Sequence, residues 1–303
     1  MTRAIVADLH SHSTFSDGEC APTELADEAR SFGLSGFALT DHDTLNGLDE
    51  MVAAGRQAGL RIIPGVEITL RFRRPRFVGS LHLLAYFSEE LLANPDFRAN
   101  ASAVLAQGRG DGLVMARVAA INDEFGPSGH QPLLEHPLTF AEVAAYGSNI
   151  SRRHFALALN ERHGISDRDT VSMIIGNDSP AYIPSGIDMA SLEPLLRDFP
   201  LVRVLAHPAA GSFPGESHYK EVLPPLETVE ELLPEFLALG LHGFEVYYPG
   251  HSLEHREVVL DWQRRYALPL VTGGSDCHDR QLRPLGGEGV TAEEFAVLVE
   301  LIG

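Results

Sequence analysis

The chain has 303 residues, enough to bury a core that folds without disulfides or a partner. Its formal net charge of -19 argues against sequence-independent binding of nucleic acid, which depends on clustered lysine and arginine. A phosphorylated substrate remains compatible with this charge, because bound divalent cations reverse the local field of an acidic site.

Cysteine usage and hydropathy indicate where the protein works. Cys20 and Cys277 are too few for a disulfide framework. The N-terminal residues reach the polar Asp8 too early for a signal peptide, and no apolar run approaches the roughly 20 residues that cross a membrane. We therefore expect a cytoplasmic protein that binds no membrane and forms no stable complex with nucleic acid. Nothing in the sequence indicates the oligomeric state.

Short apolar and β-branched runs alternate with amphipathic helical patterns along most of the chain. The first helix is expected from Thr23, as its N-cap, to about Phe32. Such alternation predicts parallel strands with helices outside them, as either a closed barrel or an open doubly wound sheet. Seven candidate strands favour the barrel: Ile5–Leu9, Gly36–Thr40, Arg61–Ile68, Ser80–Phe87, Leu201–Ala206, Gly243–Tyr248 and Leu268–Thr272.

The alternation fails between Pro95 and Ser191. This stretch has helical or irregular patterns, interrupted by glycine-rich breakers at 108–112 and 126–129. A structureless loop of this length is unusual in a compact protein. We predict an inserted, mostly helical subdomain at residues 95–190 that covers the active site, and a barrel formed by residues 1–94 and 191–303.

Imidazole and carboxylate side chains gather where the candidate strands end, which is where parallel α/β folds place their functional residues. The first strand closes as Asp8-Leu-His10-Ser-His12, and the last is followed by Asp276-Cys-His278. Side chains two positions apart on an extended strand point the same way and can bind one ion. Taken singly, most of the 14 histidines are more simply explained as surface or structural residues. Their joint placement predicts a centre for Zn²⁺, Mn²⁺ or Fe²⁺.

These motifs resemble those of the PHP (polymerase and histidinol phosphatase) family. Within that family the chain is most similar to the TrpH/YciV-like metal-dependent phosphoesterases, by residues 151–156, 181–184 and 243–251. The motifs that carry the family resemblance are Asp8-x-His10-x-His12, Ser16-Asp17-Gly18, Thr40-Asp41-His42, Gly65-Val66-Glu67, Ala206-His207-Pro208 and Gly274-Ser275-Asp276-x-His278.

The resemblance implies a distorted (β/α)7 barrel with a trinuclear metal site. One ion is expected on His10, His12, Glu67 and Asp276, and Glu67 is expected to bridge to a second ion held by His82 and His207. Asp17, His42 and His278 are expected to hold the third ion; some relatives have histidine where this chain has Asp17, which leaves the occupancy of that site open. We expect two to three divalent ions, with Mn²⁺ favoured and Zn²⁺ or Fe²⁺ as alternatives.

Such ions lower the pKa of a shared water, present it as hydroxide and neutralise charge on the phosphoryl oxygens. Lys220 is the only lysine, so phosphate binding is expected to fall to arginine. Arg152 is the first choice for this contact, with His154 beside it. The simpler interpretation of Arg152 is that it lies on a solvated helix face. The family signature Gly-Arg-Pro-His is replaced here by Ser-Arg-Arg-His at residues 151–154.

Other residues are expected to assist. His251 follows the sixth strand and is a candidate substrate contact. Asp276 or His207 could relay a proton, although both are also expected to bind metal. The carboxylates of Asp8, Asp41 and Asp43 could orient the metal-binding imidazoles or simply cap strand ends.

The leading function is therefore hydrolysis of a phosphate ester of a small nucleotide, either a nucleoside 3′,5′-bisphosphate or a nucleoside monophosphate. Histidinol-phosphate or cyclic-phosphate hydrolysis is the alternative within the family. An amidohydrolase-type amide or lactone hydrolase is a further alternative, but its usual bridging lysine is missing from the first half of the chain. A non-catalytic module, like the PHP domains of some DNA polymerases, is expected to show a degraded ligand set.

Overall fold

A computed structural model describes residues 3–75, 77–209 and 224–303. Seven strands form one sheet whose order in space follows the order in the chain. The strands are β1 (Ala7–Asp8), β2 (Gly36–Leu39), β3 (Arg61–Arg74), β4 (Phe77–Tyr86), β5 (Val202–Leu205), β6 (Gly243–Tyr247) and β7 (Leu270–Gly273).

The sheet closes on itself through the segments that follow β1 and β7. The amide of Leu9 donates to the carbonyl of Gly273 at 3.2 Å, and the amide of Asp276 donates to the carbonyl of His10 at 2.8 Å. A bridge between Ser11 and Cys277 continues this contact. The predicted distorted barrel is confirmed, and the ends of its first and last strands lie side by side.

One feature of the predicted barrel is wrong. β4 runs antiparallel to both β3 and β5, whereas all other neighbouring strands are parallel. The physical reason lies in the connection: β3 ends at Arg74 and β4 begins at Phe77, which leaves no room for the crossover of a dozen or more residues that parallel strands need.

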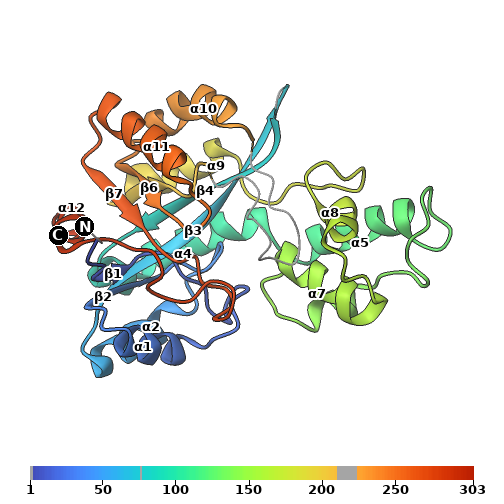
Figure 1. The fold of residues 1–303 in the computed structure, drawn as a ribbon, viewed down its shortest axis with the longest axis horizontal. Coiled ribbons are helices and arrows are strands. Elements are labelled where there is room, and N and C mark those ends of the chain that lie inside the picture. The colour runs from blue at the N-terminus through green and yellow to red at the C-terminus, as the bar shows by residue number, and fades with distance from the viewer. Residues whose placement is uncertain (1–2, 76, 210–223) are drawn as a thin grey trace.

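Helices cover the outside of the barrel (Figure 1). In that view α1 and α2 lie below the sheet, α10 and α11 lie above it, and the two chain ends lie next to each other. These barrel helices are α1 (Pro22–Ser31), α2 (Leu48–Ala58), α3 (Glu89–Ala93), α4 (Pro95–Leu105), α9 (Met189–Asp198), α10 (Leu226–Ala238), α11 (Leu253–Arg265) and α12 (Ala292–Ile302).

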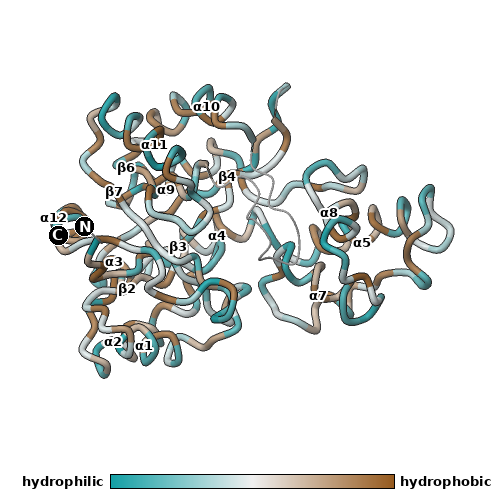
Figure 2. Tube along the Cα trace, viewed as in Figure 1, coloured by the Kyte–Doolittle hydropathy of each residue, from teal (hydrophilic) through white to brown (hydrophobic). Residues whose placement is uncertain are grey.

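A second group of helices forms a lobe beside the barrel, seen at the right of Figure 1. It comprises α5 (Asp111–Phe125), α6 (Phe140–Ala144), α7 (Arg152–His163) and α8 (Arg168–Ile175). The lobe has its own apolar cluster, which includes Val114, Phe125 and Phe155. Hydrophobic segments accordingly occur in both parts of the chain (Figure 2). We call residues 111–181 the helical lobe.

The apolar side chains of α4 and α9 belong to the barrel cluster and not to the helical lobe. Phe97 of α4 and Leu192 of α9 are buried in that cluster, and the ring of Phe97 lies 4.9 Å from the ring of Phe87. A short 3-10 helix, Ala106–Gly108, then leads toward the lobe. The independent core of the insertion is therefore narrower than residues 95–190. Among the described residues, no helix combines the length and apolar character needed to cross a membrane.

Candidate metal centre

All nine residues predicted to bind metal meet at one end of the barrel. His10 and His12 follow β1, His42 follows β2, and Glu67 and His82 lie on the paired strands β3 and β4. Asp17 comes from the loop after β1, His207 follows β5, and Asp276 and His278 follow β7. Their donor atoms form overlapping groups that could each hold a cation, and these groups share His10, His12, His42 and Glu67.

Four donors lie close enough together to share one ion. Nε2 of His12 lies 3.2 Å from Oε2 of Glu67, 3.0 Å from Oδ1 of Asp276 and 3.3 Å from Nε2 of His10. Nε2 of His10 lies 3.3 Å from Oε2 of Glu67 and 3.4 Å from Oδ1 of Asp276. Donors that bind one ion tetrahedrally at about 2.0 Å lie roughly 3.3 Å from one another, and these five distances agree with that spacing. The residues therefore fit a bound divalent ion.

Two carboxylate oxygens of this group make no hydrogen bond. Oε2 of Glu67 and Oδ1 of Asp276 are buried, and neither has a hydrogen-bond partner in the described part of the chain. Buried polar atoms normally have partners, because an unpaired one loses its interaction with water without compensation. A cation bound between His10, His12, Glu67 and Asp276 would satisfy both oxygens.

Glu67 also reaches a second group of imidazoles with its other oxygen. Oε1 lies 2.7 Å from Nδ1 of His82 and 3.0 Å from Nε2 of His207. Oε1 of Glu67 therefore faces His82 and His207, whereas Oε2 faces His10, His12 and also His42, whose Nδ1 is 3.0 Å away. This is the geometry of a carboxylate that bridges two neighbouring ions.

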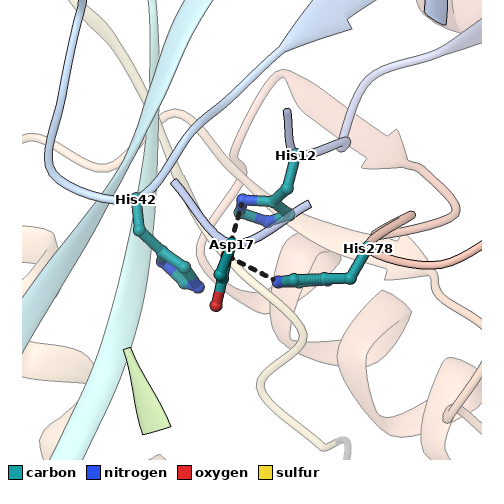
Figure 3. A group of neighbouring side chains, drawn as sticks. All are labelled: His12, Asp17, His42 and His278. Atoms are coloured by element: carbon teal, nitrogen blue, oxygen red, sulfur yellow. Dashed lines mark ion pairs between the residues drawn. The ribbon is translucent and has the colours of Figure 1, made fainter. Parts of the chain in front are cut away.

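Asp17 lies among three imidazoles, those of His12, His42 and His278 (Figure 3). Its Oδ1 is 3.1 Å from Nε2 of His278 and 3.9 Å from Nδ1 of His12. This oxygen is also buried without a hydrogen-bond partner among the residues described. The donor atoms of this group lie close enough together to hold a cation of its own.

The electrostatics of the centre are those of a cation site. Burial alone would raise the pKa of Glu67, but the charges of His82, His42 and His10 hold it well below its usual value. Burial alone would lower the pKa of His12, but Asp276 and Glu67 raise it to about 10. Without metal the carboxylates thus hold protons on imidazoles, and a metal ion must displace those protons to bind.

Residues 8–135 match the family model described as PHP domain. This part of the chain is therefore similar to the PHP domain family. The match includes His10, His12, Asp17, His42, Glu67 and His82, while His207, Asp276 and His278 lie beyond it and are brought to the same place by the fold.

Relatives extend over nearly the whole chain. It is 26% identical to a 5'-3' exoribonuclease of Haemophilus influenzae, over 89% of each protein. It is 28% identical to a 3',5'-nucleoside bisphosphate phosphatase of Chromobacterium violaceum, over 89% of this chain and 86% of the relative. The solved structure of a candidate metal-dependent phosphoesterase from Bifidobacterium adolescentis superposes with a TM-score of 0.73 at 29% identity, covering 98% of this chain and 95% of the other.

Three residues that the sequence did not point to hold the predicted metal ligands in place. Oε1 of Glu245 lies 2.9 Å from Nδ1 of His10, and its Oε2 accepts a hydrogen bond from the amide of His207 at 2.8 Å. Tyr248 donates to Oδ2 of Asp276 at 3.0 Å, and Arg283 donates to the same oxygen. Oδ1 of Asp276 is thereby left to face His10 and His12.

Only Glu245 had a sequence signal that could have revealed it. A carboxylate within the apolar strand Gly243–Tyr247 is unusual unless it has a buried partner. Tyr248 and Arg283 carry no such signal. Their roles follow from the folding of the segments after β6 and β7.

The aspartates that were expected to orient imidazoles divide by role. Asp41 accepts from the hydroxyl of Ser16, whose oxygen lies 3.4 Å from Nδ1 of His12, so it acts on an imidazole indirectly. Asp8 instead accepts hydrogen bonds from the amides of Ser275 and Gly286, both at 3.0 Å. It thereby connects the end of β1 to the segment that follows β7. Asp43 accepts hydrogen bonds from Thr69 and Arg109.

The predicted substrate-binding residues lie on the first turn of α7, except for His251. Nη2 of Arg152 donates to Oδ1 of Asn177 at 2.7 Å, and its guanidinium lies 5.3 Å from the ring centroid of Tyr182. Arg152 and Tyr182 line a small recess, together with Arg117 and Phe155. Arg152 thus points into the helical lobe.

His154 and Arg153 lie closer to the metal ligands. Nδ1 of His154 accepts a hydrogen bond from the amide of Ser151 at 2.9 Å, which closes the first turn of α7. Burial lowers the pKa of this histidine, while the charge of Asp17 acts in the opposite direction. Nη2 of Arg153 lies 3.5 Å from Oδ2 of Asp279, the residue after His278. Sequence reasoning ranked Arg152 ahead of Arg153 as a phosphate contact, and the fold places Arg153 beside the metal centre.

His251 is occupied by backbone groups. Its Nδ1 lies 2.9 Å from the carbonyl of Val246, and its Nε2 accepts from the amide of Ala209 at 3.2 Å. The ring is buried, and burial lowers the pKa of His251 to about 3. This geometry favours a role in holding the loops after β5 and β6 over contact with substrate.

Proposed function

We propose that the protein is a metal-dependent phosphoesterase that hydrolyses a phosphate ester of a small nucleotide, either a nucleoside 3′,5′-bisphosphate or a nucleoside monophosphate. The observation that carries this proposal is the buried donor group of His10, His12, Glu67 and Asp276, in which two carboxylate oxygens have no hydrogen-bond partner among the described residues. The names of the relatives from H. influenzae, C. violaceum and B. adolescentis point to the same class of reaction.

Two to three divalent ions held by the nine residues would lower the pKa of a water and neutralise charge on the phosphoryl oxygens. Mixed imidazole and carboxylate ligands suit Mn²⁺, Zn²⁺ and Fe²⁺. Of these we infer Mn²⁺ as the working ion, with Zn²⁺ or Fe²⁺ as alternatives. Glu67 would reach two neighbouring ions with its two oxygens. Glu245, Tyr248 and Arg283 hold the ligands in one orientation, so the ions bind without rearrangement of the site.

The phosphate is held, in this proposal, by the first turn of α7. Arg153 lies next to the loop of His278, and the N-terminal end of a helix favours anions through its free amides and its dipole. Arg152 lies on the same turn and lines the recess with Tyr182 and Phe155. An aromatic ring beside a guanidinium suits a nucleobase with a second phosphate, which favours a nucleotide over histidinol phosphate.

The proton steps fall to residues that are already in place. Asp276 is a weak candidate for a proton donor, because Arg283 and the neighbouring histidines overcome the effect of burial and hold its pKa well below the usual value. His207 is the better candidate of the two. Its Nδ1 has no hydrogen-bond partner among the described residues, while its Nε2 faces Glu67.

A phosphate-release panel tests the proposal. Protein reconstituted with Mn²⁺ is incubated with adenosine 3′,5′-bisphosphate, AMP, cyclic AMP, histidinol phosphate and a short RNA, and phosphate and nucleotide products are measured. We expect one nucleotide to be turned over fastest and the activity to vanish on chelation. Arg153→Gln and Arg152→Gln are expected to lower kcat/KM by about 10- to 100-fold, by loss of charge-assisted hydrogen bonds to phosphate. Arg162→Gln, at the other end of α7, is the matched control.

The other outcomes separate the alternatives. If histidinol phosphate or cyclic AMP is turned over fastest, the protein is still a phosphoesterase, but its substrate is not the proposed nucleoside bisphosphate or monophosphate. Release of mononucleotides from RNA would assign the activity named for the relative from H. influenzae. No turnover of any phosphate ester, with metal bound, would contradict the proposal and favour amide or lactone hydrolysis or a non-catalytic role.

A further inference from the structure

A second cluster of potential metal ligands lies in the helical lobe. It consists of His136 in the loop before α6, Glu142 on α6 and His163, the last residue of α7. One donor atom of each residue lies within 4.8 Å of the other two. The cluster is at the opposite end of α7 from Arg152, a distance of about 16 Å along the helix. It is therefore separate from the metal centre of the barrel.

The imidazole of His163 is buried and makes no hydrogen bond. Its side chain has no exposed surface, and Nε2 lies 3.8 Å from Oε2 of Glu142, beyond hydrogen-bond distance. Neither ring nitrogen has a hydrogen-bond partner in the described part of the chain. Leaving a buried imidazole unpaired is costly, so the position calls for a group that interacts with this ring.

The other two residues are arranged to share such a group. Oε2 of Glu142 accepts hydrogen bonds from the amide and the hydroxyl of Thr139, both at 2.8 Å, and these fix the carboxylate. The ring of His136 lies 4.2 Å from the ring of His163 at an angle of 31°. Nδ1 of His136 is 3.4 Å from the carbonyl oxygen of Pro137. The other ring nitrogen of His136, Nε2, is therefore the atom that would coordinate an ion.

We propose that His136, Glu142 and His163 bind a divalent ion of the zinc class that ties the loop before α6 to the end of α7. Two imidazoles and one carboxylate form a common zinc ligand set, with a water completing the tetrahedron. Ligands with bonds of about 2.1 Å lie roughly 3.4 Å apart, and the exposed side chain of His136 can rotate to close the remaining gap.

The position of the cluster at the C-terminal end of α7 also favours the binding of a cation. The end of a helix carries unpaired carbonyl groups and partial negative charge, so a cation is stabilised there. A cation at this end braces the helix whose first turn carries Arg152, Arg153 and His154.

The test measures zinc bound per chain for the full-length protein, after equilibration with Zn²⁺ and removal of free ion. Three proteins are compared: the wild type, His136→Gln and His130→Gln. His136 and His130 are both exposed, so neither change threatens the fold, and His130 lies outside the cluster. We expect His136→Gln to bind one zinc equivalent fewer than the wild type and His130→Gln to bind the same amount.

A second readout follows the lobe itself. Added Zn²⁺ is expected to slow proteolysis within residues 126–165 in the wild type and in His130→Gln, but not in His136→Gln. Equal zinc content in all three proteins would overturn the proposal and show that His136, Glu142 and His163 do not bind an ion. Neither readout uses phosphoesterase activity, so the result does not depend on the function proposed for the barrel.

Discussion

Several residues of the metal centre adopt backbone conformations that side-chain-bearing residues rarely use. Asp43, His207 and Asp276 have φ angles of 50°, 27° and 51°. Such conformations cost roughly 1–3 kcal/mol each and persist only where surrounding contacts impose them. At Asp276 those contacts are the hydrogen bonds from Tyr248 and Arg283, and at His207 they include the bond from its amide to Glu245. Backbone strain at these positions aims the ligands at the metal.

His251 gives a prediction about acid stability. Its pKa is about 3 in the folded protein, because burial lowers it, against about 6.5 when unfolded. Between these values the unfolded chain binds more protons, so the free energy of unfolding falls as the pH falls. His251→Gln removes this contribution and is expected to make stability less dependent on pH between 6.5 and 4.5.

The measurement is urea denaturation in the presence of chelator at pH 4.5, 5.5 and 6.5. His130→Gln is the control, because this exposed histidine has no backbone partners of this kind. A variant and a wild type with the same dependence of unfolding free energy on pH would show that His251 is not held neutral in the folded state.

At the scale of elements, the ligands are positioned by the contact between β1 and β7. The two segments approach so closely at Gly274 that a Cβ there would lie 2.4 Å from the backbone nitrogen of His10 and 2.8 Å from Oδ1 of Asp8. Backbone atoms cannot move aside as a flexible side chain can. Glycine is therefore required at this position for His10 and Asp276 to face the same ion.

Gly274→Ala is expected to separate the two segments. The change should lower the free energy of unfolding by about 1–3 kcal/mol, as overpacking in a core does. It should also weaken Mn²⁺ binding, because His10 moves away from Asp276. Gly112→Ala, in α5, is the matched control, since a Cβ there meets no atom within 4 Å. Calorimetric titration with Mn²⁺ and denaturation of both variants would check this, and unchanged metal affinity in Gly274→Ala would contradict it.

Across the whole molecule, the insertion is joined to the barrel at the metal centre. Arg109 donates to Asp43, which also accepts from the amide and hydroxyl of Thr69 at 2.8 and 2.7 Å. The side chain of Asn149 donates to the carbonyl of His42 at 2.6 Å, and Arg153 pairs with Asp279. These contacts surround the loops that carry His42 and His278. Substrate bound at the helical lobe would therefore lie against the metal ligands.

Metal binding should stabilise the whole protein, and more so at high pH. A ligand at 100 times its Kd adds about 2.7 kcal/mol to the free energy of unfolding. Without metal, Asp276 and Glu67 outweigh burial and raise the pKa of His12 to about 10, so its proton is present at pH 6 and at pH 8. An ion must displace that proton, which becomes easier as the pH rises. The rise in Tm on adding Mn²⁺ is thus expected to be larger at pH 8 than at pH 6.

Thermal unfolding with chelator and with Mn²⁺ at the two pH values checks this. Asp276→Asn is the control for the site, because asparagine tolerates the positive φ but lacks the charge that binds the ion. Its Tm should respond weakly to Mn²⁺. Equal Tm shifts at pH 6 and pH 8 in the wild type would mean that metal does not compete with bound protons.

Much of the barrel follows from local sequence. All seven predicted strands are present, because each is an apolar run bounded by polar residues, and their ends carried the ligand motifs. Local signals failed where context overrides them. Thr23 was predicted as the N-cap of α1, but the cap is Ala21, with Pro22 as the first helical residue. Proline is well suited to that position, since its fixed φ is helical and its missing amide proton is not needed there.

The residue types and their spacing are enough to predict the chemical groups of the site: imidazoles and carboxylates at strand ends, and hence a centre for divalent ions. Which of these groups meet depends on the three-dimensional fold. β4 turned out antiparallel because of a short connection, and Glu245, Tyr248, Arg109 and Arg283 joined the site from segments distant in sequence. The reason is physical: the period of a strand shows which side chains share a face, whereas contacts between strand ends depend on how the barrel closes.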